Sequence, residues 1–494
     1  MEPREKIAHL VRRLGLGGGA REIEKYVSLG YEGALNRLLA FDGPPKDTFH
    51  PLRPAFLEGE EDAQPGYYRF IALWIHALIS TEEPLREKLA IFWHDHFAVT
   101  VNDVEHGIMN LQYMQTLREV AGRPFGEILR RMAFDPALIK QLNADTSRKG
   151  HPNENFAREL VELHTVGLDQ YEERDIMDIA RAFSGVVIVD EYWMGGETNK
   201  ERLARMEEDK SMLLGTGFVP AFHDEGEKEV LGLKGKLNPE QVLDHLAKHP
   251  LTAKHLCGKL WEYFAGTKPT AGIVEGLSAV WQRTNGDIKA VVRAITERPE
   301  FWSDSVVRTR VKSPVEFVTD QYRAYGIGDL VAPLVKPGKF SDPFPMELWA
   351  IWGGFYYLCQ RLGMELLRPP SVAGWDWGQA WISTDTIAKR IETDAPLRWK
   401  KPDPAKEEYW PDEAQKRLIA YVKGLRPDSE EMIVRGIERF FDSELTDDRR
   451  APIAAFLKQL NALTIIASGD ERTLGWVLDR TYRLVRSTPE YQLC

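Results

Sequence analysis

The chain has 494 residues, of which 43% are hydrophobic and 28% charged, the usual balance for a globular protein with a sizeable core. Its formal net charge of -11 argues against a nucleic-acid-binding protein, because such a protein needs a basic face to neutralise phosphates. Three scattered cysteines, Cys257, Cys359 and Cys494, provide neither a disulfide framework nor a CxxC metal site.

The first residues lead straight into a helical pattern and lack the apolar core of a signal peptide. The sequence also has no run of about 18 apolar residues, the length that a membrane-spanning helix needs. We therefore expect a cytoplasmic protein that neither enters a membrane nor binds nucleic acid.

Most of the chain shows the hydrophobic period of α-helices. The first helical pattern covers residues 3–14 and ends at Gly15, and a second one runs over 20–39. A long helix is predicted over 81–97, with Thr81 as its N-cap and with acidic residues and Pro84 in its first turn. Further helices are predicted over 107–121, 124–133, 153–166, 173–184, 239–248, 252–265, 271–283 and 287–297.

One region departs from the helical period. Residues 185–190 are β-branched and predict a strand that pairs with 217–222 in a small hairpin. The residues between them, 194–212, are polar and charged and indicate an exposed excursion. Prolines and charges over 396–415 are typical of a linker or a wrapped loop.

The predicted fold is therefore mainly α: a large helical bundle-like single unit with a small β-hairpin insertion. The helical core is expected over 1–395, with the hairpin near 185–223. Residues 416–494 return to a helical pattern and are expected to pack on that core as C-terminal helices.

The first segment that could carry chemistry is the end of the 81–97 helix, where Asp95 lies between His94 and His96 among aromatic residues. On a regular helix the two histidines are about 200° apart and cannot share a site. If the helix ends near Asp95, the two rings can converge, and a His-x-His pair on extended backbone is a common metal-ligand arrangement. The alternative is that His94 is a hydrogen-bonded core residue and His96 faces solvent.

The second segment is the helix predicted over 153–166. Helical geometry places Glu159 and Glu162 one turn apart, with Arg158 beside them and His164 on a different side. Such a carboxylate pair can hold a cation. Alternatively, its two carboxyl groups can have different pKa values, so that one serves as an acid and the other as a base. The alternative is a solvated face with intrahelical ion pairs that involve Arg158.

Three further segments are less specific. His223 follows the second predicted strand together with Asp224 and Gly226, where either a functional loop or an Asp–Gly turn is expected. The glycine-rich residues 15–19 follow a helix rather than a strand, so a helix C-cap and turn is predicted instead of a phosphate-binding loop. The tryptophan-rich residues 368–381 predict either a cap on the core or the wall of a ligand cleft.

Several long strings, in one order, resemble the bacterial family known as domain of unknown function 1800. They extend over nearly the whole chain: 9–15, 86–97, 153–164, 178–185, 223–228, 312–317, 369–375 and 489–492. The resemblance implies a helical protein without an assigned activity, often encoded beside an exported protein of sulfatase-like fold. This sequence departs from the pattern at Ser184 and Val186, and its 194–212 insert is longer.

Because His94, His96, Glu159 and His223 lie in those strings, the first hypothesis is a metal-dependent enzyme, hydrolytic or oxidative, that uses these four residues as ligands. Glu162 would be its general base and Arg158 its anion clamp, and a divalent transition metal would be the cofactor. Its substrate, small or polymeric, is unspecified. The alternatives are a non-catalytic partner or maturation factor for the neighbouring sulfatase-like protein, and a metal-free carboxylate enzyme acting on a polar substrate.

Overall fold

The fold was analysed in a computed structural model that describes residues 1–45, 67–105, 107–188, 216–335, 346–392 and 413–494. Helices dominate the described part of the chain, and its strands form two small antiparallel sheets of two strands each. The prediction of a mainly α protein with a small hairpin is confirmed. No single helix among the described residues is both long and apolar enough to span a membrane.

The bounds of the predicted helices agree with the structure to within a few residues in most cases. The first half contains α1 (Pro3–Leu14), α2 (Gly19–Val27), α3 (Gly30–Leu39), α5 (Tyr67–Ser80), α6 (Pro84–His96), α7 (Gly107–Val120), α8 (Phe125–Ala133), α9 (Pro136–Gln141), α10 (Glu154–Glu162), α11 (Glu173–Ala182) and α13 (Pro239–Lys248). The second half contains α14 (Pro250–Ala265), α15 (Ala271–Arg283), α16 (Ile288–Glu297), α17 (Pro314–Ala324), α18 (Ile327–Val331), α19 (Met346–Arg361), α20 (Thr384–Glu392), α21 (Glu413–Gly424), α22 (Glu430–Phe440), α23 (Asp447–Gln459), α24 (Ala462–Ser468), α25 (Glu471–Arg486) and α26 (Pro489–Gln492).

Two helix boundaries differ from the sequence prediction. The 20–39 pattern divides into α2 and α3, because Gly30 adopts a φ of 66°, which is left-handed and interrupts a right-handed helix. Thr81 is not the N-cap of α6: that position belongs to Glu83, whose backbone N–H donates to Thr81 Oγ1 over 2.9 Å. Thr81 therefore shapes the turn before the helix rather than its first residue.

The strands lie within the segment that joins α11 to α13. The predicted hairpin is present as β1 (Val186–Ile188) paired antiparallel with β2 (Thr216–Phe218), in a register that places Val187 opposite Gly217. The strand predicted over 217–222 ends early because residues 220–222 form a 3-10 turn that begins at a proline. A second hairpin, β3 (Lys228–Val230) with β4 (Leu233–Gly235), was not predicted. The exposed excursion predicted over 194–212 lies outside the described residues.

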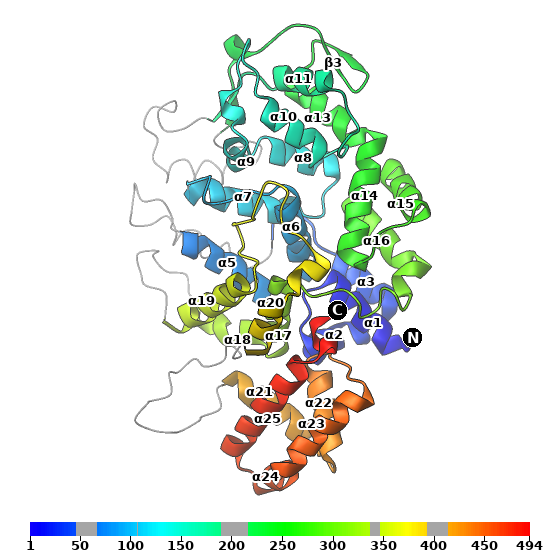
Figure 1. The fold of residues 1–494 in the computed structure, drawn as a ribbon, viewed down its shortest axis with the longest axis vertical. Coiled ribbons are helices and arrows are strands. Elements are labelled where there is room, and N and C mark those ends of the chain that lie inside the picture. The colour runs from blue at the N-terminus through cyan, green and yellow to red at the C-terminus, as the bar shows by residue number, and fades with distance from the viewer. Residues whose placement is uncertain (46–66, 106, 189–215, 336–345, 393–412) are drawn as a thin grey trace.

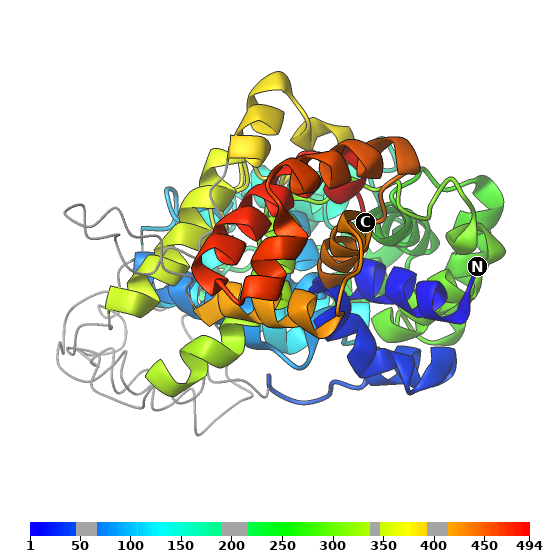
Figure 2. The same ribbon diagram turned by 90° about the horizontal axis from the view of Figure 1, so that it is seen from below.

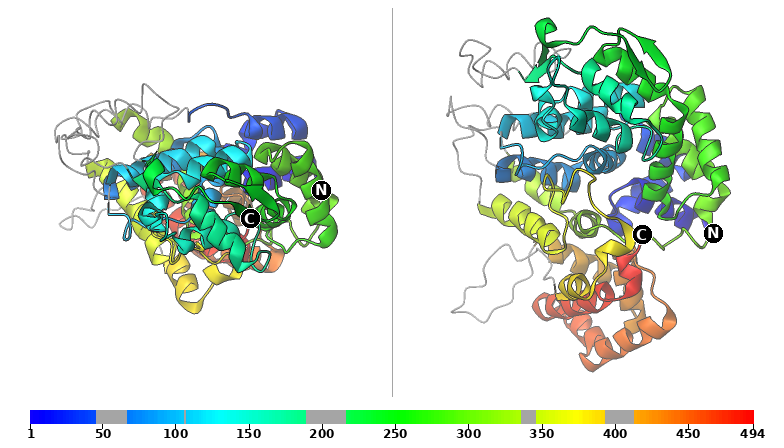
Figure 3. Two further views of the ribbon diagram at one scale, coloured as in Figure 1. Left: turned by 90° about the horizontal axis from the view of Figure 1, so that it is seen from above. Right: turned by 45° about the horizontal axis from the view of Figure 1, so that its top comes forward.

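The helices form groups that follow one another along the long axis of the molecule (Figure 1). The helices α8 to α13 and the strands occupy one end, α5 to α7 lie in the middle, and α21 to α25 occupy the other end (Figures 1 and 3). Seen from below, α21 to α25 lie in front with the N-terminal helices beside them (Figure 2), and α22 packs against α2. Most of the 396–415 linker predicted between core and C-terminal helices lies outside the described residues, and α21 begins at Glu413.

Two helices in the middle of the molecule are buried along their whole length, although they carry many charges. Every residue of α6 and every residue of α17 is buried. A helix that is buried on all sides is normally apolar, because an unpaired charge in the interior costs several kcal/mol. The ionisable residues of α6 and α17 must therefore be paired or neutral, and their environments define the candidate site.

Candidate functional site

His94 is tied into the core by both of its ring nitrogens. Leu367 donates its backbone N–H to His94 Nε2 over 2.9 Å, and His94 Nδ1 lies 3.0 Å from the hydroxyl of Tyr113. Because that hydroxyl donates to Phe97 O over 2.7 Å, it accepts a hydrogen bond from His94 Nδ1–H, which fixes the tautomer. Burial lowers the pKa of His94 to about 3. His94 is therefore a neutral, fully hydrogen-bonded residue.

His96 lies on another side of α6 and meets two more histidines and a lysine. Its Nε2 donates to the backbone oxygen of His164 over 3.2 Å, and Lys259 places Nζ 3.0 Å from its Nδ1. The ring centroid of His96 is 5.6 Å from that of His164 and 6.5 Å from that of His255. We call His96, His164, His255 and Lys259 the histidine cluster. The expectation that His96 faces solvent is wrong, since this residue is buried.

The electrostatics of the histidine cluster keep its rings neutral. Burial, assisted by the nearby ammonium of Lys259, lowers the pKa of His96 far below its usual value, that of His164 to about 3 and that of His255 to about 4. Burial also lowers the pKa of Lys259, whose side chain is partly exposed. Among the members of the cluster, Lys259 is therefore the charged group, and burial shifts its pKa in the direction of neutral pH.

Two imidazole nitrogens in the cluster have no hydrogen-bond partner although they are buried. They are Nδ1 of His164 and Nε2 of His255. Buried polar atoms are nearly always paired, so unpaired ones indicate a site that a water molecule or ligand completes. No group of three or more His, Cys, Asp or Glu residues in the described part of the chain is arranged to hold a metal ion.

Asp95 connects the histidine cluster to the tryptophan-rich loop. Its Oδ1 accepts the backbone N–H of Trp375 over 2.7 Å. Gly374 permits this contact: it has a φ of 83°, and a Cβ there would lie 2.3 Å from Asp95 Oδ1. Burial raises the pKa of Asp95 to about 6, against the opposing effects of the Trp375 hydrogen bond and the charge of Lys259. Lys259 and Asp95 thus have pKa values shifted toward each other.

The loop itself contributes both to the core and to an accessible surface. Trp375 and Trp381 are buried, as a cap on the core requires, whereas Trp377 is only partly buried. The ring of Trp377 packs edge-on against Tyr263, one turn after Lys259 on α14, with centroids 5.1 Å apart. An aromatic surface therefore lies one helical turn from the Lys259 ammonium.

Arg158, Glu159 and Glu162 lie on α10 and do not join the histidine cluster through any side-chain contact among the described residues. Arg158 forms a bidentate ion pair with Glu173 over 3.0 and 2.8 Å, and its distance to Glu162 is 3.8 Å. Tyr171 donates its hydroxyl to Glu162. Burial and the neighbouring Glu162 raise the pKa of Glu159, which is half-buried. The alternative of intrahelical ion pairs is met only in part: the Arg158–Glu162 pair is within α10, but the shorter ion pair of Arg158 is with Glu173 on α11.

His223 belongs to a second polar group around α11. Its Nδ1 donates to Ser184 O over 2.9 Å, and Arg181 forms a bidentate ion pair with Asp224 over 2.9 and 3.1 Å. The backbone N–H of Gly226 donates to Asp224 Oδ1 over 2.8 Å, as in an Asp–Gly turn. Within the described ranges no hydrogen bond or ring contact joins His223 to His94, His96 or Glu159. The four predicted metal ligands are thus placed in separate environments.

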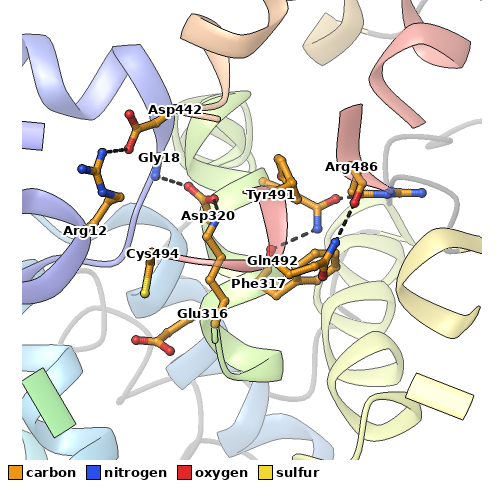
Figure 4. Close-up of polar contacts among 12 residues, drawn as sticks. Arg12, Gly18, Glu316, Phe317, Asp320, Asp442, Arg486, Tyr491, Gln492 and Cys494 are labelled. Atoms are coloured by element: carbon orange, nitrogen blue, oxygen red, sulfur yellow. Dashed lines mark hydrogen bonds and ion pairs between the residues drawn. The ribbon is translucent and has the colours of Figure 1, made fainter. Parts of the chain in front are cut away.

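A third polar group encloses a small cavity between α1, α6 and α17. Figure 4 shows five of its lining residues: Arg12, Glu316, Asp320, Asp442 and Cys494. The cavity leaves about 20 Å³ accessible to the centres of water molecules. Arg12, Gly15, Leu16, Gly17, Lys88, Lys312, Glu316, Asp320, Asp442 and Cys494 line it, and we call it the charged cavity. The glycine turn at 15–17 forms one wall, and Gly15 is the C-cap of α1, as predicted.

The charges that line this cavity are paired. Arg12 is 2.7 Å from Asp442, Lys88 is 3.0 Å from Glu316, and Lys312 is 2.7 Å from Asp320. Lys88 also donates to the backbone oxygens of Arg12 and Gly15 over 3.0 and 2.9 Å, so it closes the end of α1. These pairs hold α1, α6, α17 and the loop after α22 together.

Fold and site define a helical protein with a buried polar centre on its middle helices. The family model described as protein of unknown function (DUF1800) matches residues 9–493, and the chain belongs to this family. No curated protein and no solved structure matches it.

The strings that carry the family resemblance converge in the structure. Those at 9–15, 86–97, 312–317, 369–375 and 489–492 meet around α6 and α17, as the contacts of Lys88 with Arg12 O and of Asp95 with Trp375 N show. The string at 153–164 reaches the same centre through His164. The strings at 178–185 and 223–228 meet each other through Arg181 and Asp224.

Proposed function

We propose that this protein is an enzyme that transfers protons to and from a polar substrate at the histidine cluster. The observation that carries the proposal is the 3.0 Å contact between Lys259 Nζ and His96 Nδ1. Lys259 and His255 are partly exposed, whereas His96 and His164 are buried and neutral. Lys259 would be the general acid and base, and His96 would hold its Nζ in place.

The protonation states support this assignment of roles. The pKa of His96 is so far below its usual value that the shared proton stays on Lys259. Burial lowers the pKa of Lys259, which brings it toward neutrality, where general acid–base catalysis is most effective. Asp95, whose pKa is about 6, supplies a second group that exchanges protons near neutral pH.

The surroundings of Lys259 favour a polar substrate with an apolar face. The partly exposed ring of Trp377 and the ring of Tyr263 form the neighbouring wall. Aromatic side chains of this kind stack on apolar faces while a charged group binds the polar edge. The proposal thus keeps the metal-free enzyme of the sequence hypotheses but replaces its paired acids, Glu159 and Glu162, with Lys259 and Asp95.

A comparison of variants in host-cell extract tests this function. Purified wild-type protein, Lys259→Met and Lys254→Met are incubated with the small-molecule fraction of the extract, and consumed compounds are identified by mass spectrometry. Lys254 is an exposed residue on the same helix and serves as the matched control. We expect wild type and Lys254→Met to consume the same compound and Lys259→Met to leave it intact. Equal profiles for wild type and Lys259→Met would contradict the proposal.

A metal-dependent enzyme is the second candidate, favoured by the unpaired nitrogens of His164 and His255. Imidazole nitrogens are good ligands for transition metals. The ammonium of Lys259 argues against it, because it would repel a cation at the same place. Metal analysis of protein purified without a histidine tag decides between the two: stoichiometric metal that is lost in His164→Ala would favour the second candidate.

A role as partner of the neighbouring sulfatase-like protein remains a third prediction. It rests on the family resemblance alone, because the structure contains a single chain. Co-purification of the two proteins from the host would support it.

A further inference from the structure

We propose that Cys494 is a reactive thiolate that small peroxides oxidise to sulfenic acid within the charged cavity. This inference is independent of the function proposed for the histidine cluster. It rests on the arrangement of cations around the thiol, on an arginine that lacks a carboxylate partner and on the cavity beside the sulfur.

The cations around Cys494 outnumber the carboxylates. Arg310 places Nη1 3.5 Å from Cys494 Sγ, and the charges of Arg13 and Lys88 also act on the thiol. Glu316 is the carboxylate that opposes them, and it is already shared between Arg310 at 2.7 Å and Lys88 at 3.0 Å. Two cations therefore share one carboxylate next to the sulfur. Figure 4 shows the thiol near the Glu316 carboxylate, with Asp320 and the Arg12–Asp442 pair beyond.

Arg13 is the unusual member of this group. It is fully buried and forms no ion pair with any residue that the structure describes. It donates to Val306 O, while its Nε and Nη1 have no partner, and Nη2 of Arg310 has none either. A buried guanidinium without an ion-pair partner is costly, and burial lowers the pKa of Arg13 to about 10. The groups whose negative charge favours its ionised form are the Cys494 thiol and, after it, Glu316.

The field of these cations changes the acidity of the thiol. Burial alone would raise the pKa of Cys494, but Arg310 and Arg13 outweigh burial and lower the pKa below its usual value. The remaining charges that line the cavity balance one another, because Arg12 pairs with Asp442 and Lys312 with Asp320. The thiolate form is thus stabilised by cations that have no better partner.

The cavity gives the sulfur room for a reagent. Its volume of about 20 Å³ for water centres suits one small molecule, and hydrogen peroxide is among the smallest oxidants. The thiolate sulfur attacks one peroxide oxygen, an S–O bond forms and the O–O bond breaks. Hydroxide leaves and takes a proton from solvent, the sulfur is oxidised by two electrons, and the peroxide is reduced to water.

The chain provides its own controls for a test, because Cys257 and Cys359 are also free and buried. Burial raises the pKa of both thiols, that of Cys257 to about 12. The full-length protein is treated with hydrogen peroxide at pH 6, the peroxide is removed with catalase, and the chain is unfolded in dimedone. Mass spectrometry of the three cysteine peptides then measures how much of each was oxidised.

We expect at least tenfold more dimedone adduct on Cys494 than on Cys257 or Cys359. Oxidation of the three cysteines to the same extent, or no adduct on Cys494, would overturn the proposal. The rate between pH 8 and pH 6 gives a second measure: we expect it to fall less steeply for Cys494 than for Cys257 and Cys359, because the pKa of Cys494 is lowered and those of the other two thiols are raised. A tenfold fall for each pH unit would indicate an ordinary protonated thiol and would equally overturn it.

Discussion

The charged cavity and the histidine cluster both lie in the middle of the molecule, but they differ in whether their charged side chains have a carboxylate partner. Around the cavity, Arg12, Lys88 and Lys312 each have a carboxylate within 3.0 Å. In the cluster, no carboxylate lies within ion-pair distance of Lys259 among the described residues; its close contact is with the neutral His96, and two imidazole nitrogens are unpaired.

The difference indicates which of the two regions holds the fold together and which is available for chemistry. A buried ion pair that loses one partner leaves an uncompensated charge, so its members are needed for stability. A partly exposed lysine beside neutral rings contributes little to stability but has a shifted pKa, which is typical of functional sites. The following predictions test this difference, from the largest expected effect to the smallest.

The same substitution should have opposite consequences in the two regions. Lys88→Met removes a cation that pairs with Glu316 and caps α1, so we expect it to lower the free energy of unfolding by about 3–5 kcal/mol. Lys259→Met should change it by less than about 1 kcal/mol. Urea unfolding followed by circular dichroism measures both, with the exposed Lys234→Met as a neutral reference. Similar losses of unfolding free energy for Lys88→Met and Lys259→Met would contradict the difference between the charged cavity and the histidine cluster.

A methyl group at Gly374 should disturb the contact between the tryptophan loop and Asp95. Its Cβ would lie 2.3 Å from Asp95 Oδ1 at a left-handed φ, so we expect Gly374→Ala to cost about 3 kcal/mol. Gly378 in the same loop also has a left-handed φ, but nothing lies within 4 Å of its Cβ position, and Gly378→Ala should cost about 1 kcal/mol. Thermal unfolding of the two variants compares them, and equal costs would show that the Asp95 contact is unimportant.

Acid should destabilise the folded protein, because its buried histidines are neutral. The pKa of His94 is about 3 in the folded chain and 6.5 when unfolded, so the unfolded state binds a proton first as the pH falls below 6.5. At pH 5 this lowers the free energy of unfolding by about 2 kcal/mol relative to pH 7. His94→Gln should lack this contribution, so its loss between pH 7 and pH 5 should be smaller than that of wild type by about that amount. Identical pH dependence would mean that His94 titrates normally.

The ion pairs on α10 should matter least for stability. The side chain of Arg158 is 33% exposed and its partner Glu173 is 73% exposed. Because solvent screens such pairs, Arg158→Ala should lower the free energy of unfolding by less than about 1 kcal/mol. A loss above about 2 kcal/mol in urea unfolding would place this helix face among the essential contacts.

Much of the fold could be predicted from the sequence, because helical periodicity and the β-branched run at 186–188 are local signals. The hairpin of β3 and β4 was missed because its strands are short and polar. Its turn is also unusual, since Leu231 adopts a φ of 46° before Gly232.

The site was predicted only in part, because its members come from distant parts of the sequence. The segment at 94–96 was identified, but the helix continues through His96, so His94 and His96 diverge and meet different neighbours. His255 and Lys259 were overlooked, although their spacing places them one turn apart on a predicted helix. Only tertiary structure shows that this turn of α14 faces His96.

The acidity of Lys259 tests the central claim most directly. An amine-reactive anhydride labels deprotonated lysines, and the pH dependence of labelling at the Lys259 peptide gives the pKa of that side chain, with exposed Lys254 as the reference. We expect half-maximal reactivity below pH 10.5 for Lys259 in wild type and a different value in His96→Phe, because the contact with Nδ1 is lost. Half-maximal reactivity of Lys259 at or above pH 10.5 would contradict an acid–base role for the histidine cluster.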